Sequence, residues 1–417
     1  MDYKKIIIEY QEFIKNIDVI TRDYRIEPQL NYVITGVRRA GKTWFLFQII
    51  KEYYENKYEN ILYINFEDER FIGFTHRDFD QLLSAYYELY PGLKPVLFLD
   101  EIQIVDGWQN FCRRVADQKY KIYITGSNAK MLSSDIASTL GGRFMTMEIT
   151  PLSFKEYLYF KDIHITKNDI YSKKINIIKN NFSDYFNFGG FPEVLNVENK
   201  RNYLHNIFTT VFYNDIIAKN KIRNIQGIKL LIKKIAESTN DELSYNRIKN
   251  LLKASGVTVG TSTIISWVET LKDSFLIKEL QNINYHFSER ESKKKYYFID
   301  NGLLFALGVQ SPSKLLETLT YNFLNKTSPY LMFYKTTNFE IDFIISEKSL
   351  IQVSYTIDND LTLKRESKAL IKAGKHLGIS NLYIITYDTE KTFETDEQII
   401  NIIPVWKVLL EPELIKK

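Results

Sequence analysis

The stretch from Asn31 to Ile50 holds the residue types that phosphate chemistry requires. Within it, residues 36–43 read Gly-Val-Arg-Arg-Ala-Gly-Lys-Thr and fit the pattern G-x-x-x-x-G-K-S/T. Glycines allow backbone N–H groups to curl around an anion, Lys42 can reach the outer phosphates of a nucleotide, and the Thr43 hydroxyl can ligate Mg²⁺. The alternative is a glycine turn that happens to carry a lysine. The residues expected to contact the nucleotide are Gly36, Val37, Arg38, Arg39, Ala40, Gly41, Lys42, Thr43 and Trp44.

Two acidic residues follow a second apolar run. Residues 96–99 are apolar, and Asp100 and Glu101 come directly after them. Because open α/β sheets bind ligands at the carboxyl ends of their strands, both carboxylates are expected beside the phosphate loop. Asp100 would hold Mg²⁺, directly or through water, and Glu101 would polarise the water that attacks the γ-phosphate. The metal ligands that the sequence predicts are Thr43 and Asp100.

Two further polar residues stand where a catalytic role is conceivable. Asn128, with Ser127 as second choice, follows an apolar strand and could hydrogen-bond the γ-phosphate or the attacking water; a helix N-cap is the alternative. Arg143 follows a pair of glycines and could stabilise transition-state charge, in cis or across a subunit interface; a structural salt bridge is the alternative. The predicted catalytic residues are Lys42, Glu101, Asn128 and Arg143.

A parallel sheet is needed to bring these side chains together. Its strands are predicted by the apolar runs at 32–34, 60–66, 95–99, 121–125 and 145–149. An acidic cluster follows the second of these runs at 67–69, where a solvated strand end is favoured over contact with Mg²⁺ or water. Residues 1–30 predict an amphipathic helix followed by a connector, Arg22-Asp23-Tyr24-Arg25, that could cap the nucleotide base.

The order and spacing of these motifs carry a family resemblance. GVRRAGKT, FLDE, TGSN and GGR, in this order, resemble the AAA-type P-loop ATPases of the AAA+ class. PLSFKEY at 151–157, FGGFPE at 188–193 and FYNDI at 212–216 are similar to bacterial and archaeal AAA-family proteins with a C-terminal domain of unknown function that resembles a restriction endonuclease. Relatives usually have arginine where this chain has Asn214. The resemblance implies a Walker A loop, ATP as ligand, Mg²⁺ as cofactor and an ATPase activity.

The middle of the chain divides into two expected domains. Residues 151–222 read as helical, and the resemblance implies a lid over the nucleotide, with Arg201, Lys219 and Lys221 available as its basic contributor. Residues 223–308 show helix-turn-helix patterning followed by two strands around a basic loop at 290–295, which is the outline of a winged helix. Its candidate recognition helix, at 261–271, lacks arginine, so DNA binding and a protein-interaction role stay open.

The C-terminal part, 309–417, follows the order helix, three strands, helix, strand and resembles the restriction-endonuclease fold. Asp342 and Glu317 match the acidic positions that would bind Mg²⁺ in such a nuclease. Gln352-Val353-Ser354 stands where Glu-x-Lys is expected, so the catalytic lysine is missing unless another, such as Lys335 or Lys364, has taken its place. We therefore expect a degenerate domain without nuclease activity.

Composition sets the outer limits. A chain of 417 residues with 45% hydrophobic and 25% charged residues predicts a multidomain globular protein, and one cysteine excludes an internal disulfide and suits the cytoplasm. No apolar run is long enough for a membrane span, and the net charge of +4 permits DNA binding without arguing for it. The expected fold is α/β: a P-loop NTPase parallel sheet at 1–150, a helical lid at 151–222, a winged helix at 223–308 and a restriction-endonuclease-like α/β domain at 309–417. The expected partners are ATP, and DNA, a protein or further copies of the chain.

Overall fold

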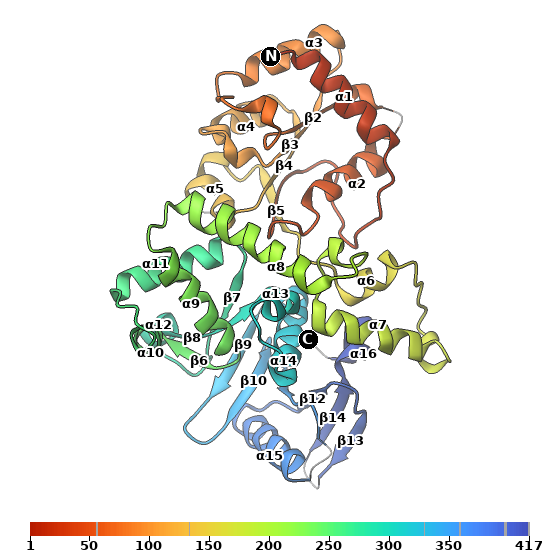
Figure 1. The fold of residues 1–417 in the computed structure, drawn as a ribbon. Helices are drawn as coiled ribbons and strands as arrows, with labels where there is room; N and C mark the ends of the chain where they lie inside the picture. The colour runs from red at the N-terminus through yellow and green to blue at the C-terminus, as the bar shows by residue number, and fades with distance from the viewer. Residues whose placement is uncertain (56, 133, 329, 358–359, 396–397, 416–417) are drawn as a thin grey trace. The chain divides into compact units, whose positions relative to one another are not determined.

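The computed structural model describes residues 1–417 except 56, 133, 329, 358–359, 396–397 and 416–417, and it leaves out the side chains of 132, 134, 135, 137 and 360. The chain forms two compact units, residues 1–150 with 273–275 and residues 151–272 with 276–417 (Figure 1). Among the helices of the described residues, none is long and apolar enough to cross a membrane. The expectation of a cytoplasmic location stays a prediction.

The first unit is built on a parallel five-stranded sheet with the order β2-β3-β4-β1-β5. Its strands are β1 (Asn31–Thr35), β2 (Ile61–Asn65), β3 (Val96–Asp100), β4 (Lys121–Gly126) and β5 (Phe144–Glu148). Strand β1 lies between β4 and β5 and is parallel to both, and β3 lies between β2 and β4. All five predicted strands are present, and the α/β fold with a P-loop NTPase sheet is confirmed.

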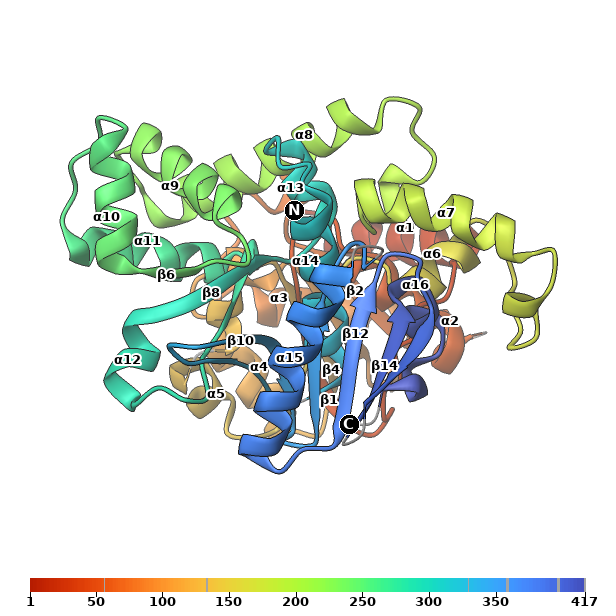
Figure 2. The ribbon, with the colours of Figure 1, turned by 90° about the horizontal axis from the view of Figure 1, so that it is seen from below.

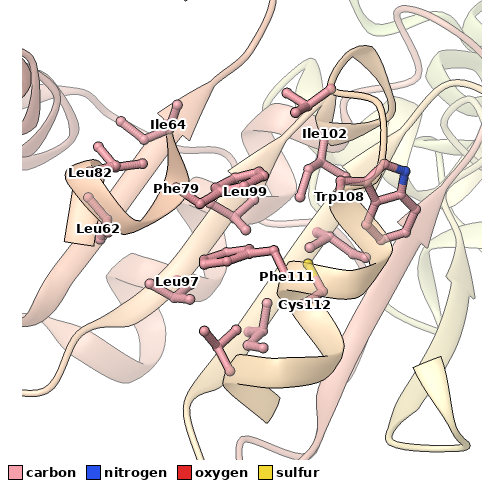
Figure 3. Close-up of a cluster of buried hydrophobic side chains, with 14 of the residues drawn as sticks. Leu62, Ile64, Phe79, Leu82, Leu97, Leu99, Ile102, Trp108, Phe111 and Cys112 are labelled. Carbon is pink, nitrogen blue, oxygen red and sulfur yellow. The ribbon is translucent and has the colours of Figure 1, made fainter. Parts of the chain in front are cut away.

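Five helices accompany this sheet: α1 (Tyr3–Asn16), α2 (Lys42–Tyr54), α3 (Phe79–Leu89), α4 (Trp108–Asp117) and α5 (Ser134–Leu140). Alternate residues of β2 and β3, such as Leu62 and Leu97, face one core with α3 and α4 (Figure 3). Phe79 of α3 and Phe111 of α4 stack there with ring centroids 4.0 Å apart. Cys112 is fully buried beside them and is a packing residue.

Helix α2 covers the opposite face of the sheet. Phe47 and Tyr54 of this helix contact Tyr63 and Phe98, with ring centroids 5.1 and 6.0 Å apart. Both faces of the central strands are therefore buried, which is why these strands read as continuous apolar runs. The packing holds α2 rigidly behind the phosphate loop that precedes it.

The second unit begins with helices α6 (Phe154–Phe160), α7 (Ile175–Phe188) and α8 (Lys200–Thr210), followed by a π-helical stretch, Val211–Ala218. Ser153 and Glu156 form a capping box that starts α6. The Gly189–Gly190 break after α7 is held by Asp300, whose carboxylate accepts hydrogen bonds from the backbone N–H groups of Gly190 at 2.8 Å and Gly302 at 2.7 Å. The segment that carries the FGGFPE motif is thereby joined to the start of α13 through one buried carboxylate.

The next part follows the order of elements that a winged helix requires. Helix α9 (Ile225–Glu237), strand β6 (Glu242–Ser244), helices α10 (Tyr245–Ala254) and α11 (Thr261–Asp273), and strands β7 (Ile277–Leu280) and β8 (Lys293–Phe298) succeed one another. The three strands form an antiparallel sheet, β6-β8-β7. A short helix, α12 (Phe287–Ser292), lies between β7 and β8.

The sequence analysis predicted a basic loop at 290–295, and this prediction is wrong. Arg290 lies in α12, and Lys293–Lys295 form the start of β8. Lys294 and Lys295 are 3% and 1% exposed, because carboxylates from other elements surround their ammonium groups. Lysines that are buried and paired cannot serve as a phosphate-binding wing.

The C-terminal part contains a mixed six-stranded sheet with the order β13-β14-β12-β11-β10-β9. Figure 2 shows two neighbouring strands of this sheet, β12 and β14. Helices α13 (Asn301–Ala306) and α14 (Pro312–Thr327) precede the sheet. The strands are β9 (Leu331–Lys335), β10 (Glu340–Ile345), β11 (Ser349–Val353), β12 (Asn381–Thr386), β13 (Lys391–Glu394) and β14 (Ile399–Pro404). Helix α15 (Asp360–Leu377) lies between β11 and β12 in the chain, and α16 (Val405–Leu410) follows β14. The predicted αβββαβ order is present from α14 to β12, and two strands and a helix follow it that the sequence analysis did not predict.

Candidate nucleotide site

The phosphate loop connects β1 to α2 and is shaped by two close contacts. Gly36 has φ +143°, and a Cβ atom there would overlap the backbone carbonyl oxygen of Ile149, so only glycine fits. Arg22 is buried, and its guanidinium donates hydrogen bonds to the carbonyl oxygens of Ala40 and Thr150, each at 2.9 Å. The connector that precedes β1 therefore braces the loop from behind.

Lys42 lies at the first position of α2, with its side chain 5% exposed. Its ammonium group donates to the carbonyl oxygens of Gly36 at 3.2 Å and Val37 at 3.3 Å, and it lies 3.5 Å from a carboxylate oxygen of Glu101. Gly41 precedes it with φ +97° and leaves the helix N-terminus open. The lysine charge, the helix dipole and the loop backbone thus meet at the N-terminus of α2, as an anion-binding loop requires.

Asp100 ends β3 and is fully buried. Its carboxylate accepts hydrogen bonds from the Thr43 hydroxyl at 2.7 Å, the Tyr63 hydroxyl at 2.9 Å and the Thr125 hydroxyl. Burial first, and then the charge of Glu101, raises the pKa of Asp100 above its ordinary value. A cation beside Thr43 and Asp100 would offset the cost of burying the Asp100 charge. The Thr43 hydroxyl and the Asp100 carboxylate are oxygen ligands of the kind that Mg²⁺ prefers.

Glu101 adopts the left-handed backbone conformation, with φ +51° and ψ +40°. Its backbone N–H donates to the Thr125 hydroxyl at 2.9 Å, and its carboxylate accepts from the Gln103 side-chain amide at 2.5 Å. A Cβ on Gly126 would overlap two side chains, the Met131 Sδ atom and, at 2.5 Å, the Gln103 Oε1 atom. Glu101 thus has a strained backbone, and Thr125 and Gln103 hold its main chain and its carboxylate. Backbone strain of this kind is common at functional sites.

The other residues of the loop are distributed as follows. Val37 and Ala40 are fully buried and support the turn, whereas Trp44 is half exposed. Arg38 is paired with Glu67 through two hydrogen bonds of 2.6 and 3.2 Å. Arg39 has φ +67° and an exposed side chain.

Glu67, from the acidic cluster after β2, is exposed at the strand end, as the sequence analysis favoured, and it also pairs with Arg38 of the loop. Asp68 in the same cluster caps the next short helix and pairs with Arg70 at 2.7 Å. These contacts give the cluster a structural role.

Asn128 and Arg143 make the contacts that their structural alternatives predict. The Asn128 side-chain oxygen accepts a hydrogen bond from the Lys130 backbone N–H at 2.7 Å. Arg143 is 37% exposed, lies 2.6 Å from the Asp117 carboxylate and donates to the Gly141 carbonyl oxygen at 3.2 Å. Their catalytic roles stay predictions. Ser127 is buried.

Sequence reasoning missed the residues that hold the site together, namely Arg22, Tyr63, Gln103 and Thr125. Thr125 and Tyr63 lie near the carboxyl ends of strands that neighbour β3, where polar side chains stood out within apolar runs. Gln103 has no comparable signal, because an amide three residues from an aspartate fits many loops.

The acidic positions of the nuclease-like domain come together as predicted, but with an unforeseen lysine. Lys295 of β8 lies 3.5 Å from Glu317 and 3.7 Å from Asp342. Lys335 instead pairs with Glu340 at 2.9 Å, and Lys364 is exposed, so neither supplies the missing charge. The lysine beside Glu317 and Asp342 is thus Lys295 rather than either of the two that the sequence analysis named as possible replacements.

Two family models and several known proteins match this chain. The model of the AAA domain matches residues 29–158, and the model of a domain of unknown function, DUF8612, matches residues 179–314. The uncharacterized protein MJ1544 of Methanocaldococcus jannaschii is 36% identical over 423 residues, which cover 97% of this chain and 94% of that protein. An uncharacterized protein of Haemophilus influenzae is 30% identical over 85% of this chain and 93% of its own length.

Among solved structures, the chain is similar to the Walker-type ATPase paby2304 of Pyrococcus abyssi, at 14% identity and a TM-score of 0.41, over 73% of this chain and 94% of that one. Cdc6p of Pyrobaculum aerophilum is 13% identical with a TM-score of 0.27, over 76% of this chain and 93% of that one. Similarities of this size add nothing to the argument about function. The AAA-domain match, the phosphate loop on its parallel sheet and the near full-length likeness to MJ1544 show that the chain belongs to the AAA-type P-loop ATPase family.

Proposed function

We propose that the chain binds ATP and hydrolyses it with Mg²⁺. The observation that carries the proposal is the bond between the Thr43 hydroxyl and the buried Asp100 carboxylate, with Lys42 and Glu101 beside them. Together they supply a phosphate-binding cation, two oxygen ligands for a metal and a base at one edge of the sheet. The family and the fold by themselves support a nucleotide-binding site of the P-loop type, without specifying hydrolysis.

Each residue has a distinct task in this proposal. Lys42 would exchange its two loop carbonyl partners for phosphate oxygens, and the backbone N–H groups of the loop would hold the β-phosphate. Thr43 and Asp100 would hold Mg²⁺, which when bound neutralises charge on the phosphate oxygens. Glu101 would take the proton of the attacking water, held in place by Gln103 and Thr125. Asn128 would contact the γ-phosphate, and Arg143 would stabilise transition-state charge in cis or from a second copy of the chain.

Two variants test the hydrolysis proposal. Lys42→Ala should lose nucleotide binding, whereas Glu101→Gln should bind ATP normally and hydrolyse it about 10²–10⁴-fold more slowly. ATP binding by fluorescence titration and phosphate release measure the two effects separately. Hydrolysis by Glu101→Gln at the wild-type rate would remove Glu101 from the role of base.

We also propose that the second unit consists of a helical lid at 151–222, a winged helix at 223–308 and a degenerate nuclease-like domain at 309–417. The winged helix would couple nucleotide state to a DNA or protein partner. Because two lysines of β8 are buried in ion pairs, DNA contact would depend on the exposed basic residues of α10, which are Arg247, Lys249 and Lys253. DNA is the first partner to test, since these charges suit phosphate contacts.

Comparison of the ATP hydrolysis rate with and without double-stranded DNA decides between the partners. Stimulation that falls steeply with salt and is lost in Lys249→Glu/Lys253→Glu would make the chain a DNA-dependent ATPase. Hydrolysis that ignores DNA would favour a protein partner, which can be captured with the ATP-locked Glu101→Gln. Slow, unstimulated turnover would instead favour a nucleotide-switched scaffold.

A further inference from the structure

Lys295 is a buried cation at the centre of an acidic cluster in the second unit. It lies on β8 with 1% of its surface exposed, and its ammonium group lies 5.2 Å from the centre of the Phe333 ring. The nearest carboxylate oxygens are those of Glu340 at 2.8 Å, Glu317 at 3.5 Å and Asp342 at 3.7 Å. The ammonium group therefore lies among three carboxylates, which can offset the cost of burying its charge.

The acidic residues around it come from two other elements. Glu317 lies on α14 and accepts a hydrogen bond from the Tyr297 hydroxyl at 2.7 Å. Asp342 lies on β10 and accepts one from the Val353 backbone N–H at 2.8 Å. Glu340, two residues before Asp342, also pairs with Lys335 at 2.9 Å. Every carboxylate in the cluster thus has a second donor within the second unit.

Gln352, which stands in place of the glutamate of a Glu-x-Lys motif, is turned to other partners. Its side-chain oxygen accepts a hydrogen bond from the Asp342 backbone N–H at 3.3 Å, and its amide donates to Glu366 at 2.8 Å. A neutral amide used in this way adds no negative charge to the cluster. Among the described residues, no group of three or more acidic, histidine or cysteine side chains is placed to hold a metal ion, so a metal in the position of Lys295 would have Glu317 and Asp342 as its protein ligands and water as the others.

A divalent cation and an ammonium group answer the same electrostatic need by different means. Two or three buried carboxylates repel one another and require positive charge nearby. Mg²⁺ meets this need with oxygen ligands at about 2.0–2.1 Å, whereas an ammonium group meets it through three donated hydrogen bonds on a flexible stem. The Lys295 ammonium lies between Glu317 and Asp342, where a metal held by those two acids would have to be.

We propose that Lys295 permanently occupies the cation position of this acidic site and turns it into an internal ion-pair centre that excludes Mg²⁺. The site then serves to join three elements, β8 of the three-stranded sheet, α14 and β10 of the six-stranded sheet. The domain binds no catalytic metal and cuts no DNA, independently of whether the phosphate loop hydrolyses ATP.

Removal of the lysine should uncover a metal site. In Lys295→Ala, the melting temperature should fall without metal and rise by several degrees when Mn²⁺ is added. The matched control is Lys295→Ala/Asp342→Asn, in which the Mn²⁺ effect of this site should disappear. Because the proposed nucleotide site would also bind Mn²⁺, only the difference between these two variants is decisive. If the alanine variant does not fold, Lys295→Gln, which keeps a polar side chain of similar length, is a second variant for the same test.

The wild-type chain provides the converse test. Mn²⁺ titrated against the wild type and against Asp342→Asn should give the same change in melting temperature, and neither should cleave DNA with Mg²⁺ or Mn²⁺. An Mn²⁺ stabilisation or a DNA cleavage activity of the wild type that Asp342→Asn abolishes would overturn the proposal. A folded lysine variant that gains no Asp342-dependent Mn²⁺ binding would overturn it as well.

Discussion

The hydroxyl of Thr43 donates a hydrogen bond of 2.7 Å to the carboxylate of Asp100, which joins the phosphate loop to the carboxyl end of β3. The same carboxylate accepts hydrogen bonds from the hydroxyls of Tyr63 and Thr125. Side chains of α2, β2 and β4 therefore meet at the buried carboxylate of Asp100. This arrangement fixes where a cation could sit before any nucleotide arrives.

Thr43→Val should therefore separate nucleotide binding from its metal dependence. The variant keeps the shape of the side chain but removes the hydroxyl, so we expect ATP affinity in Mg²⁺ to fall about 10–100-fold, with little change in EDTA. Thr43→Ser keeps the hydroxyl and should behave like the wild type. Isothermal titration with and without Mg²⁺ measures this; equal losses in both buffers would place the effect in the loop backbone.

Gln103 should act as a positioning residue for Glu101. The Gln103→Ala variant loses the amide that holds the carboxylate, so we expect kcat to fall about tenfold while the KM for ATP changes less than about twofold. Asn110, an amide elsewhere in this unit that no proposal uses, offers Asn110→Ala as the control. A rise in kcat for Gln103→Ala would mean that Gln103 restrains Glu101 instead of aligning it.

Arg143 offers a test of assembly. If it acts as a finger, Arg143→Ala should lower kcat by about 10³-fold or more, although the exposed pair with Asp117 contributes less than about 1 kcal/mol to stability. Asp117→Ala leaves Arg143 in place and should keep its activity. Hydrolysis measured over a range of protein concentrations distinguishes action in trans from action in cis. Wild-type rates for Arg143→Ala would leave Arg143 with the ion pair alone.

Asp300 should make the stability of the second unit depend on pH. Burial raises the pKa of its carboxyl to about 6, so the folded chain holds a proton that the unfolded chain has lost. The stability that Asp300 contributes is therefore greatest below about pH 4 and decreases as pH rises to about 6, by about 3 kcal/mol for a two-unit shift.

Asp300→Asn removes this titration and leaves one of two backbone N–H groups without an acceptor, at a cost of about 1–3 kcal/mol. The wild type should thus exceed the variant in free energy of unfolding by about 1–3 kcal/mol near pH 4. This difference should fall by about 3 kcal/mol as the pH rises through 6, so that the variant becomes as stable as the wild type or more stable. Urea titrations across this range measure it. A difference that does not vary with pH would show that Asp300 is ionised in the folded chain throughout.

The sequence was informative where one element alone determines the outcome. The strands of the first unit were predictable because parallel strands buried on both faces are continuous apolar runs, and the phosphate loop because its pattern lies between a strand and a helix. Lys294 and Lys295 were misplaced because their partners, such as Glu279 and Glu317, lie on other elements of the fold. A run of three lysines looks like a solvated loop until those carboxylates are brought to it.

Gln103 and Arg22 could not be identified for a related reason. Their roles come from a single donor placed against Glu101 or Ala40, and no residue pattern marks such a contact. Strands β13 and β14 lie after the part of the chain that the expected αβββαβ order covers, so the fold analogy gave no place for them.

The position of β1 in its sheet has a consequence for biosynthesis. The strand that carries the phosphate loop pairs with β4 and β5, both of which follow it in the chain, and Gly36 closes against Ile149 beyond β5. While the ribosome is still making the segment between β1 and β4, the loop has no sheet to hold it. A chain that ends before Ile149 should therefore lack the folded form of the phosphate loop and, if the proposed function holds, should not bind ATP.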